Sequence, residues 1–328
     1  MNIAKTKNRR GILCFGILMI LVFTALPSGA ADFPKGPMNF WVPFNPGGET
    51  DIEIRAMQPS LEKNFGVPLV INYLPGAGGA LCWSKLAAAK PDGYTLGGVN
   101  IPHIILQPKF MKDVNFKPED FSILCIIEYT ATGLAVKKDF RASTLNEFID
   151  YARINPGKVS CGGVGKFSGQ HFAALQFMKM TNTKLNYVTF SGTGVLQTAL
   201  MGGHIDAAFA SSAQMVGTKE QIKILAIGSE KRIPQIADTP TFKELGLEFY
   251  PRTTRGVIAP KGVPMEIQKR LEAAFLDAIH KPEFKAKMEQ AGFIVQGLGM
   301  GESHKYVESE AATIYRLSQE FNLLPSAK

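Results

Sequence analysis

Cysteine is scarce in this chain, with only 4 among 328 residues. Cys14 lies in an apolar N-terminal run, and the others, Cys82, Cys125 and Cys161, are far apart in the sequence. Small domains that depend on disulfides carry many cysteines at close spacing. The sequence therefore predicts stability from hydrophobic cores, and the spacing gives no support to a bridge among these three cysteines.

Histidine is also scarce, and the 5 histidines form no HExxH motif and no Cys–His pairing that would indicate a metal site. Neither a P-loop nor a dinucleotide-binding fingerprint is present. Ser168 and His171 are three residues apart, but no third partner of a catalytic triad stands at a recognisable spacing. Ser168 is instead predicted to be the N-cap of the helix that contains His171. These absences predict no metal, no cofactor and no catalytic residues, so the protein is not expected to be an enzyme.

No excess of charged residues is present either, since hydrophobic residues make up 45% and charged residues 20%. This balance, without internal repeats, excludes a disordered chain, a collagen-like chain and a membrane protein with many spans. Half of the formal charge of +8 lies at the N-terminus, where four basic residues precede the first acidic one. Without those four, 36 − 4 = 32 basic residues face 28 acidic ones, and the resulting +4 predicts no nucleic-acid partner.

The four basic residues are followed by an uncharged run over residues 11–26 and by small residues at Ser28 and Ala30. This order is typical of a secretory signal peptide cleaved near Ala30, which places the mature protein in the periplasm. A membrane anchor is the alternative, but the run is shorter than the roughly 20 residues that a spanning helix needs. Residues 1–30 are therefore assigned to a signal peptide.

Short β-branched or aromatic runs alternate with amphipathic stretches along the rest of the chain. This alternation predicts an α/β protein with largely parallel sheets. The predicted strands are residues 38–42, 69–72, 94–99, 121–127, 159–161, 186–188, 205–209 and 222–226. The predicted helices are residues 84–89, 145–154, 170–180, 264–279 and 301–321.

Two extended runs, residues 131–136 and 252–259, are interpreted as crossings between two domains. If the chain crosses twice, its C-terminal helices return to the first domain. We therefore expect a discontinuous lobe 1 over residues 31–132 plus 255–328, and a lobe 2 over residues 133–254. A cleft between two such lobes is a natural site for a small molecule.

Three glycine-rich loops, at residues 41–51, 72–80 and 160–171, each follow a predicted strand and lead into a helix. The N-terminus of a helix presents free backbone N–H groups and partial positive charge, so it can hold an anion without a basic side chain. Glycine lets the backbone approach a ligand closely, although each loop alone also fits a tight turn. Together the loops predict a carboxylate site in the cleft.

The order and spacing of several motifs resemble those of the Bug family, the extracytoplasmic solute receptors of tripartite tricarboxylate transporters. The motifs are PFxxGGxTD at 43–51, NxxPGAGG at 72–79, PDGYTL at 91–96, GGHID at 202–206 and DTPTFxExG at 238–246. The resemblance covers essentially the whole chain after residue 30. It implies a type II periplasmic-binding-protein fold with two α/β lobes, a carboxylate held by loops 44–51 and 162–171, and delivery to a two-component membrane permease.

The sequence departs from the family pattern at Glu49, where Ser or Gly is usual, and at Lys166 and Phe167. A carboxylate at position 49 would repel a carboxylate ligand unless it faces solvent, pairs with Lys166 or meets an amino group of the ligand. A lone buried Glu49 would be costly. The ligand is therefore expected to be a small monocarboxylate, aromatic or amino-substituted, rather than a di- or tricarboxylate.

The resulting prediction is a monomeric periplasmic receptor that captures a small organic acid or amino-acid-like ligand and delivers it to a membrane permease. Two alternatives remain: a secreted α/β enzyme acting on a small organic acid, and a receptor of the same fold that signals to a membrane sensor. The predicted ligand-binding residues are Phe44, Asn45, Gly47, Gly48, Glu49, Thr50, Asp51, Gly78, Gly165, Lys166, Phe167, Ser168, His171 and Asp206.

Overall fold

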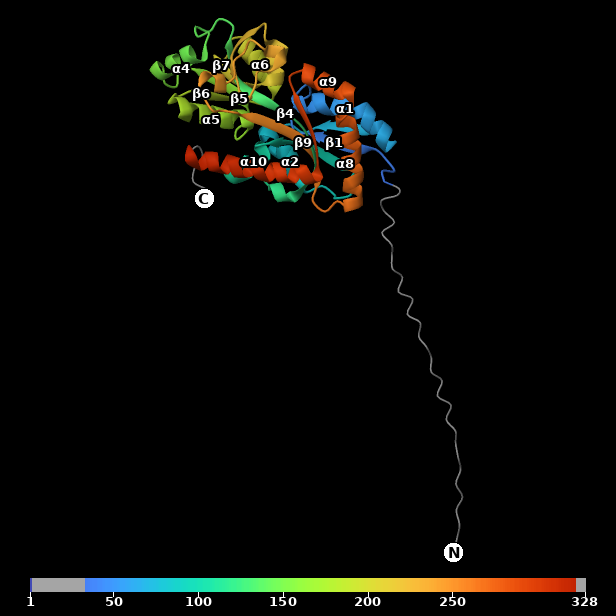
Figure 1. The fold of residues 1–328 in the computed structure, drawn as a ribbon. Helices are drawn as coiled ribbons and strands as arrows, with labels where there is room; N and C mark the ends of the chain where they lie inside the picture. Colours follow the sequence, from blue (N-terminus) through green and yellow to red (C-terminus); the bar gives the residue numbers. More distant parts are fainter. Residues whose placement is uncertain (2–32, 323–328) are drawn as a thin grey trace. The chain divides into compact units, whose positions relative to one another are not determined.

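The computed structural model describes residue 1 and residues 33–322, so the predicted signal peptide lies outside the described residues. The chain divides into two units, Met1–Phe33 and Pro34–Lys328, and the fold lies in the second. Its strands alternate with helices along the chain, which confirms the predicted α/β class (Figure 1).

The strands of this second unit join in one sheet. Their order is β2 (Leu69–Tyr73), β1 (Met38–Val42), β3 (Thr95–Ile101), β9 (Arg252–Pro260), β4 (Phe121–Lys137), β7 (Ala207–Ser211), β5 (Ser160–Val164) and β6 (Asn186–Phe190). Two more strands, β8 (Ile222–Ile227) and β10 (Ile294–Gly299), also pair with β4. Figure 1 shows β4 and β9 running between a group that contains β1 and a group that contains β5, β6 and β7.

The expectation of largely parallel pairing holds only for the outer strands. β1 pairs in parallel with β2 and β3, and β5 pairs in parallel with β6 and β7. Every pair that includes β4 or β9 is antiparallel. The physical reason is that β4 and β9 carry the chain in opposite directions between the two groups of strands, so they cannot be parallel to each other.

β4 is longer than predicted, because strand 121–127 and the extended run 131–136 form one continuous strand of 17 residues. Its first part pairs with β9 as far as Ala131, and its second part pairs with β7 from Thr132 onward. The second predicted crossing is β9 itself. The lobe boundaries at 132/133 and 254/255 stay predictions.

Ten α-helices cover the sheet in the described residues. They are α1 (Glu49–Phe65), α2 (Ala80–Ala87), α3 (His103–Phe110), α4 (Leu145–Ile154), α5 (Gly169–Thr181), α6 (Thr193–Met201), α7 (Ser212–Thr218), α8 (Met265–Ile279), α9 (Pro282–Gln290) and α10 (Met300–Glu320). The predicted bounds of α4 are confirmed, and a capping box fixes its start: the Thr144 hydroxyl accepts from the Glu147 N–H at 3.2 Å, and the Glu147 carboxylate accepts from the Thr144 N–H. Helices α3, α6, α7 and α9 and strand β10 were not predicted from the sequence.

The cores are built from large side chains on the helices and on the strands that they cover. One cluster includes Trp83, Ile126 and Ile258, and another includes Phe148 and Phe177. The cysteines at 82, 125 and 161 are all buried and free, and Cys161 belongs to the second cluster. Burial raises the pKa of the Cys82 thiol to about 12, so this side chain remains a small protonated apolar group.

Candidate ligand-binding site

A cavity of about 30 Å³ lies where α1, α5 and α6 begin, beside β3 and β9. Its volume suits one or two water molecules and is far below that of a pocket for an organic ligand. A larger ligand therefore requires the surrounding loops to separate. The cavity is lined by Phe44, Gly48, Glu49, Thr50, Asn100, His103, Val164, Gln170, Thr193, Thr253 and Arg255.

The first glycine loop brings the N-terminus of α1 to this cavity. Gly48 is the N-cap, with Glu49 and Thr50 in the first turn, so backbone N–H groups and the positive end of the helix dipole lie beside it. Asp51 stabilises this loop: its carboxylate accepts from the Gly47 N–H at 2.8 Å and from the Tyr73 hydroxyl at 2.7 Å. Asp51 thus shapes the loop rather than lining the cavity.

The loop before α5 approaches from the other group of strands. Ser168 is its N-cap, and the Ser168 hydroxyl accepts from the His171 N–H at 3.0 Å, as predicted from the sequence. The His171 ring nitrogen Nδ1 accepts from the N–H of Phe167 at 3.1 Å, which supports the left-handed backbone of that residue at φ 54°. Burial lowers the pKa of His171 to about 4, so the ring is neutral and can accept this bond.

The second and third glycine loops touch each other. A Cβ built on Gly165 would lie only 3.0 Å from the Cα of Gly78, so no side chain fits between the two backbones. The Gln107 amide donates to the Gly78 carbonyl at 2.9 Å and holds that loop in place. Phe167 stacks on Phe110 with ring centroids 5.6 Å apart. These contacts keep the loops together on this side of the cavity.

Glu49 does not have the partner suggested by the sequence. The side chain is 5% exposed, and its carboxylate accepts from the Arg255 guanidinium on β9 and from the hydroxyl of Ser211 at the start of α7. Lys166 is exposed instead, so neither solvent nor Lys166 neutralises Glu49. Arg255 was not predicted as a site residue, although an arginine inside the extended run 252–259 was a visible signal.

Arg255 is the centre of a buried charge cluster. Its guanidinium donates to Glu128 at 2.9 Å and to the Thr130 hydroxyl at 3.0 Å, and it lies 3.7 Å from Glu53. Burial raises the pKa of Glu128 to about 7, and burial together with Glu128 raises the pKa of Glu53 well above its ordinary value. Burial opposes the charge of Arg255, but the surrounding carboxylates outweigh it and raise the arginine pKa.

Two other predicted site residues lie away from the cavity lining. The Asp206 carboxylate accepts from the Ser160 N–H at 3.0 Å and pairs with Lys137 at 3.2 Å, so it joins the edges of β5 and β4. Asn45 faces Gly192 at the start of α6: a Cβ on that glycine would lie 3.8 Å from the Asn45 amide nitrogen. The structure therefore groups Phe44, Gly48, Glu49 and Thr50 around the cavity, and the remaining predicted residues do not line it.

Comparisons with known proteins test the family resemblance that the sequence motifs suggested. The family model described as "Tripartite tricarboxylate transporter family receptor" matches residues 54–323. The chain belongs to this family. A UPF0065 protein of Cupriavidus necator is 29% identical over 298 residues, which cover 90% of each chain. The receptor family predicted from the glycine motifs is thereby confirmed.

Solved structures agree with the receptor fold. A protein of R. palustris solved with adipate has a TM-score of 0.83 at 25% identity, covering 90% of this receptor and 100% of that chain. MatC of Rhodopseudomonas palustris with bound malate has a TM-score of 0.82 at 25% identity, covering 87% of this receptor and 99% of that chain. The receptor thus has the predicted type II periplasmic-binding-protein fold, with two α/β lobes.

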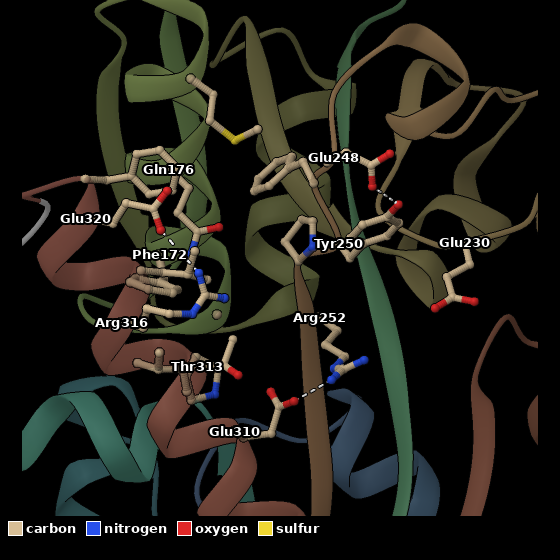
Figure 2. Close-up of a pocket in the computed structure, with 18 residues that line it drawn as sticks. Phe172, Gln176, Glu230, Glu248, Tyr250, Arg252, Glu310, Thr313, Arg316 and Glu320 are labelled. Atoms are coloured by element: carbon tan, nitrogen blue, oxygen red, sulfur yellow. Dashed lines mark hydrogen bonds and ion pairs between the residues drawn. The ribbon is translucent and has the colours of Figure 1, made fainter.

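A larger cavity of about 470 Å³ lies between α5, the segment before β9 and the C-terminal half of α10 (Figure 2). Its arginines already have partners: Arg252 pairs with Glu310, and Arg316 pairs with Glu320 at 3.2 Å. Glu230 and Glu248 also line it. Because carboxylates outnumber arginines here, we do not assign the carboxylate site of the receptor to this cavity.

Two further findings concern residues 33–322. No helix in this part of the chain combines the length and the apolar character needed to cross a bilayer. Its histidine, cysteine and acidic side chains also form no group of three that could hold a metal ion.

The N-cap of α5 provides a first prediction. Replacing Ser168 with Ala removes the acceptor for the His171 N–H, so we expect a loss of about 1 kcal/mol in the free energy of unfolding. Urea denaturation measures this loss. The exposed control Ser191→Ala should change stability by less than about 0.5 kcal/mol. Equal, small effects in both variants would show that the Ser168 hydroxyl does not stabilise the loop.

Proposed function

We propose that this receptor works in the periplasm, captures a small carboxylate-containing ligand between its lobes and delivers it to a tripartite tricarboxylate-type membrane transporter. One observation carries the proposal: the N-terminus of α1 meets residues from α5 and α6 at a single cavity. The positive end of a helix and its free N–H groups suit a carboxylate. The adipate and malate complexes of the similar R. palustris proteins support the same ligand chemistry.

A thermal-shift screen of residues 31–328 tests the ligand class. The panel contains mono- and dicarboxylates of two to eight carbons, amino acids, and amines and sugars without a carboxylate. At least one carboxylate should raise the melting temperature, because a ligand present at about 100 times its Kd stabilises the folded state by about 2.7 kcal/mol. Stabilisation by amines or sugars alone would contradict the proposal.

Delivery to a transporter needs a separate test in cells. Uptake of the radiolabelled ligand should fall to background when either the receptor gene or the gene for the polytopic permease of the transporter is deleted. Chemical analysis of the ligand after incubation with the purified protein should recover it unchanged. Uptake that persists without the receptor, or conversion of the ligand into a product, would contradict the proposal.

A further inference from the structure

The cavity beside α1 lacks free positive charge. Among its lining residues Arg255 is the cation, and it faces the carboxylates of Glu49, Glu53 and Glu128. His103 also lines the cavity, but burial, together with Arg255, lowers its pKa to about 3, so the ring is neutral. A second anionic group of the ligand would therefore lie near carboxylates here, and no side-chain cation would be free to pair with it.

The same cavity has buried polar atoms without a partner. They are the Thr50 hydroxyl, the Asn100 side-chain oxygen and His103 Nδ1, on side chains that are 4%, 3% and 4% exposed. Buried polar atoms are normally hydrogen-bonded, so unpartnered ones that line a cavity indicate where a polar ligand group belongs. The Asn100 oxygen can only accept, and a neutral imidazole nitrogen and a hydroxyl can accept as well. The ligand group that fits is a hydrogen-bond donor.

We propose that Glu49 determines the specificity of this receptor, selecting a ligand that carries an ammonium group as well as its carboxylate. This inference rests on the proposed function, because it assumes carboxylate binding by the lobes. Arg255 and Ser211 hold the Glu49 carboxylate at the cavity, and each of its oxygens can accept a further hydrogen bond. The ligand ammonium binds there beside Asn100, and the N–H groups at the helix starts remain for the ligand carboxylate.

Matched ligand pairs test the inference by calorimetry on residues 31–328. In each pair an ω-amino acid has an ammonium where the dicarboxylate has its second carboxylate: β-alanine against succinate, 4-aminobutyrate against glutarate, and 5-aminopentanoate against adipate. In at least one pair the amino acid should bind about tenfold tighter or more, which corresponds to about 1.4 kcal/mol. Tighter binding of the dicarboxylate in every pair would overturn the inference while leaving the proposed function intact. If neither member of any pair binds and no other carboxylate does, the proposed function itself fails.

The variant Glu49→Gln tests whether the charge of the Glu49 side chain, rather than its shape, sets the ligand preference. The amide is similar in size to the carboxylate but carries no charge, so the preference for the amino acid should fall about tenfold or more. The control Glu302→Gln removes a carboxylate from the first turn of α10, where the side chain is exposed, and should keep the wild-type preference. An unchanged preference in a folded Glu49→Gln protein would overturn the role of Glu49. If that variant does not fold, the ligand pairs on the wild-type protein still test the preference for an ammonium group, and Glu49→Ser, which also removes the charge, tests the role of Glu49.

Discussion

Replacing Arg255 with Met is expected to destabilise the folded receptor by about 3–5 kcal/mol at pH 8, because it leaves buried carboxylates without their cation. The guanidinium contacts Glu49 and Glu128 and lies 3.7 Å from Glu53, and these carboxylate side chains are 5%, 0% and 1% exposed. None of them can turn to water without moving α1 or β4. The free energy of unfolding from urea titration measures the effect.

Two comparisons distinguish this explanation from a general loss of packing. Arg316→Met removes an arginine from an exposed ion pair on α10 and should cost less than about 1 kcal/mol. Adding Glu128→Gln to Arg255→Met should recover part of the stability, because one uncompensated carboxylate disappears. Lowering the pH from 8 to 5 should also reduce the cost, since protonation removes the unpaired charges. If neither change helps, lost packing and not charge is the cause.

The local chemistry of the site could be predicted from the sequence where it depends on neighbouring residues. The N-cap role of Ser168 and the start of a helix after the first glycine loop were predicted from residues that are a few positions apart. Helix caps are local interactions, so their signals lie within one turn of sequence. The same holds for the glycine loops that identify the family.

Contacts between distant segments could not be predicted in this way. Arg255 is 206 residues from Glu49 and 127 residues from Glu128, so no spacing rule connects them. The polar residues Glu128 and Thr130 also made β4 resemble two separate strands, although both are buried because they bind Arg255. Here a tertiary interaction overrides the local pattern. Helix α3 was also hidden by the local pattern, because proline is unfavourable inside a helix. It begins directly after Pro102 and contains Pro108.

The second large effect is a change in the pH dependence of stability in Glu128→Gln. Burial raises the pKa of Glu128 from 4.5 to about 7 in the folded protein. Between these two pH values the unfolded chain has lost the proton and the folded protein keeps it, so this group makes the receptor less stable as the pH rises. At about 1.4 kcal/mol per pKa unit, the loss over the interval is about 3 kcal/mol.

The glutamine variant carries no such proton, and the loss of Glu128 also lowers the raised pKa of Glu53. Its stability relative to the wild type should therefore rise by about 3 kcal/mol or more between pH 4.5 and 7. The quantity to measure is the difference in stability between the two proteins at each pH. Burial lowers the pKa values of His103 and His171, so these histidines make both proteins more stable as the pH rises, and their contribution is removed in the difference. Urea titrations at half-unit pH intervals provide it, with Glu302→Gln as a control that should keep the shape of the wild-type curve. A difference that stays flat across this range would mean that Glu128 is ionised in the folded receptor, and that Arg255 fully balances its charge.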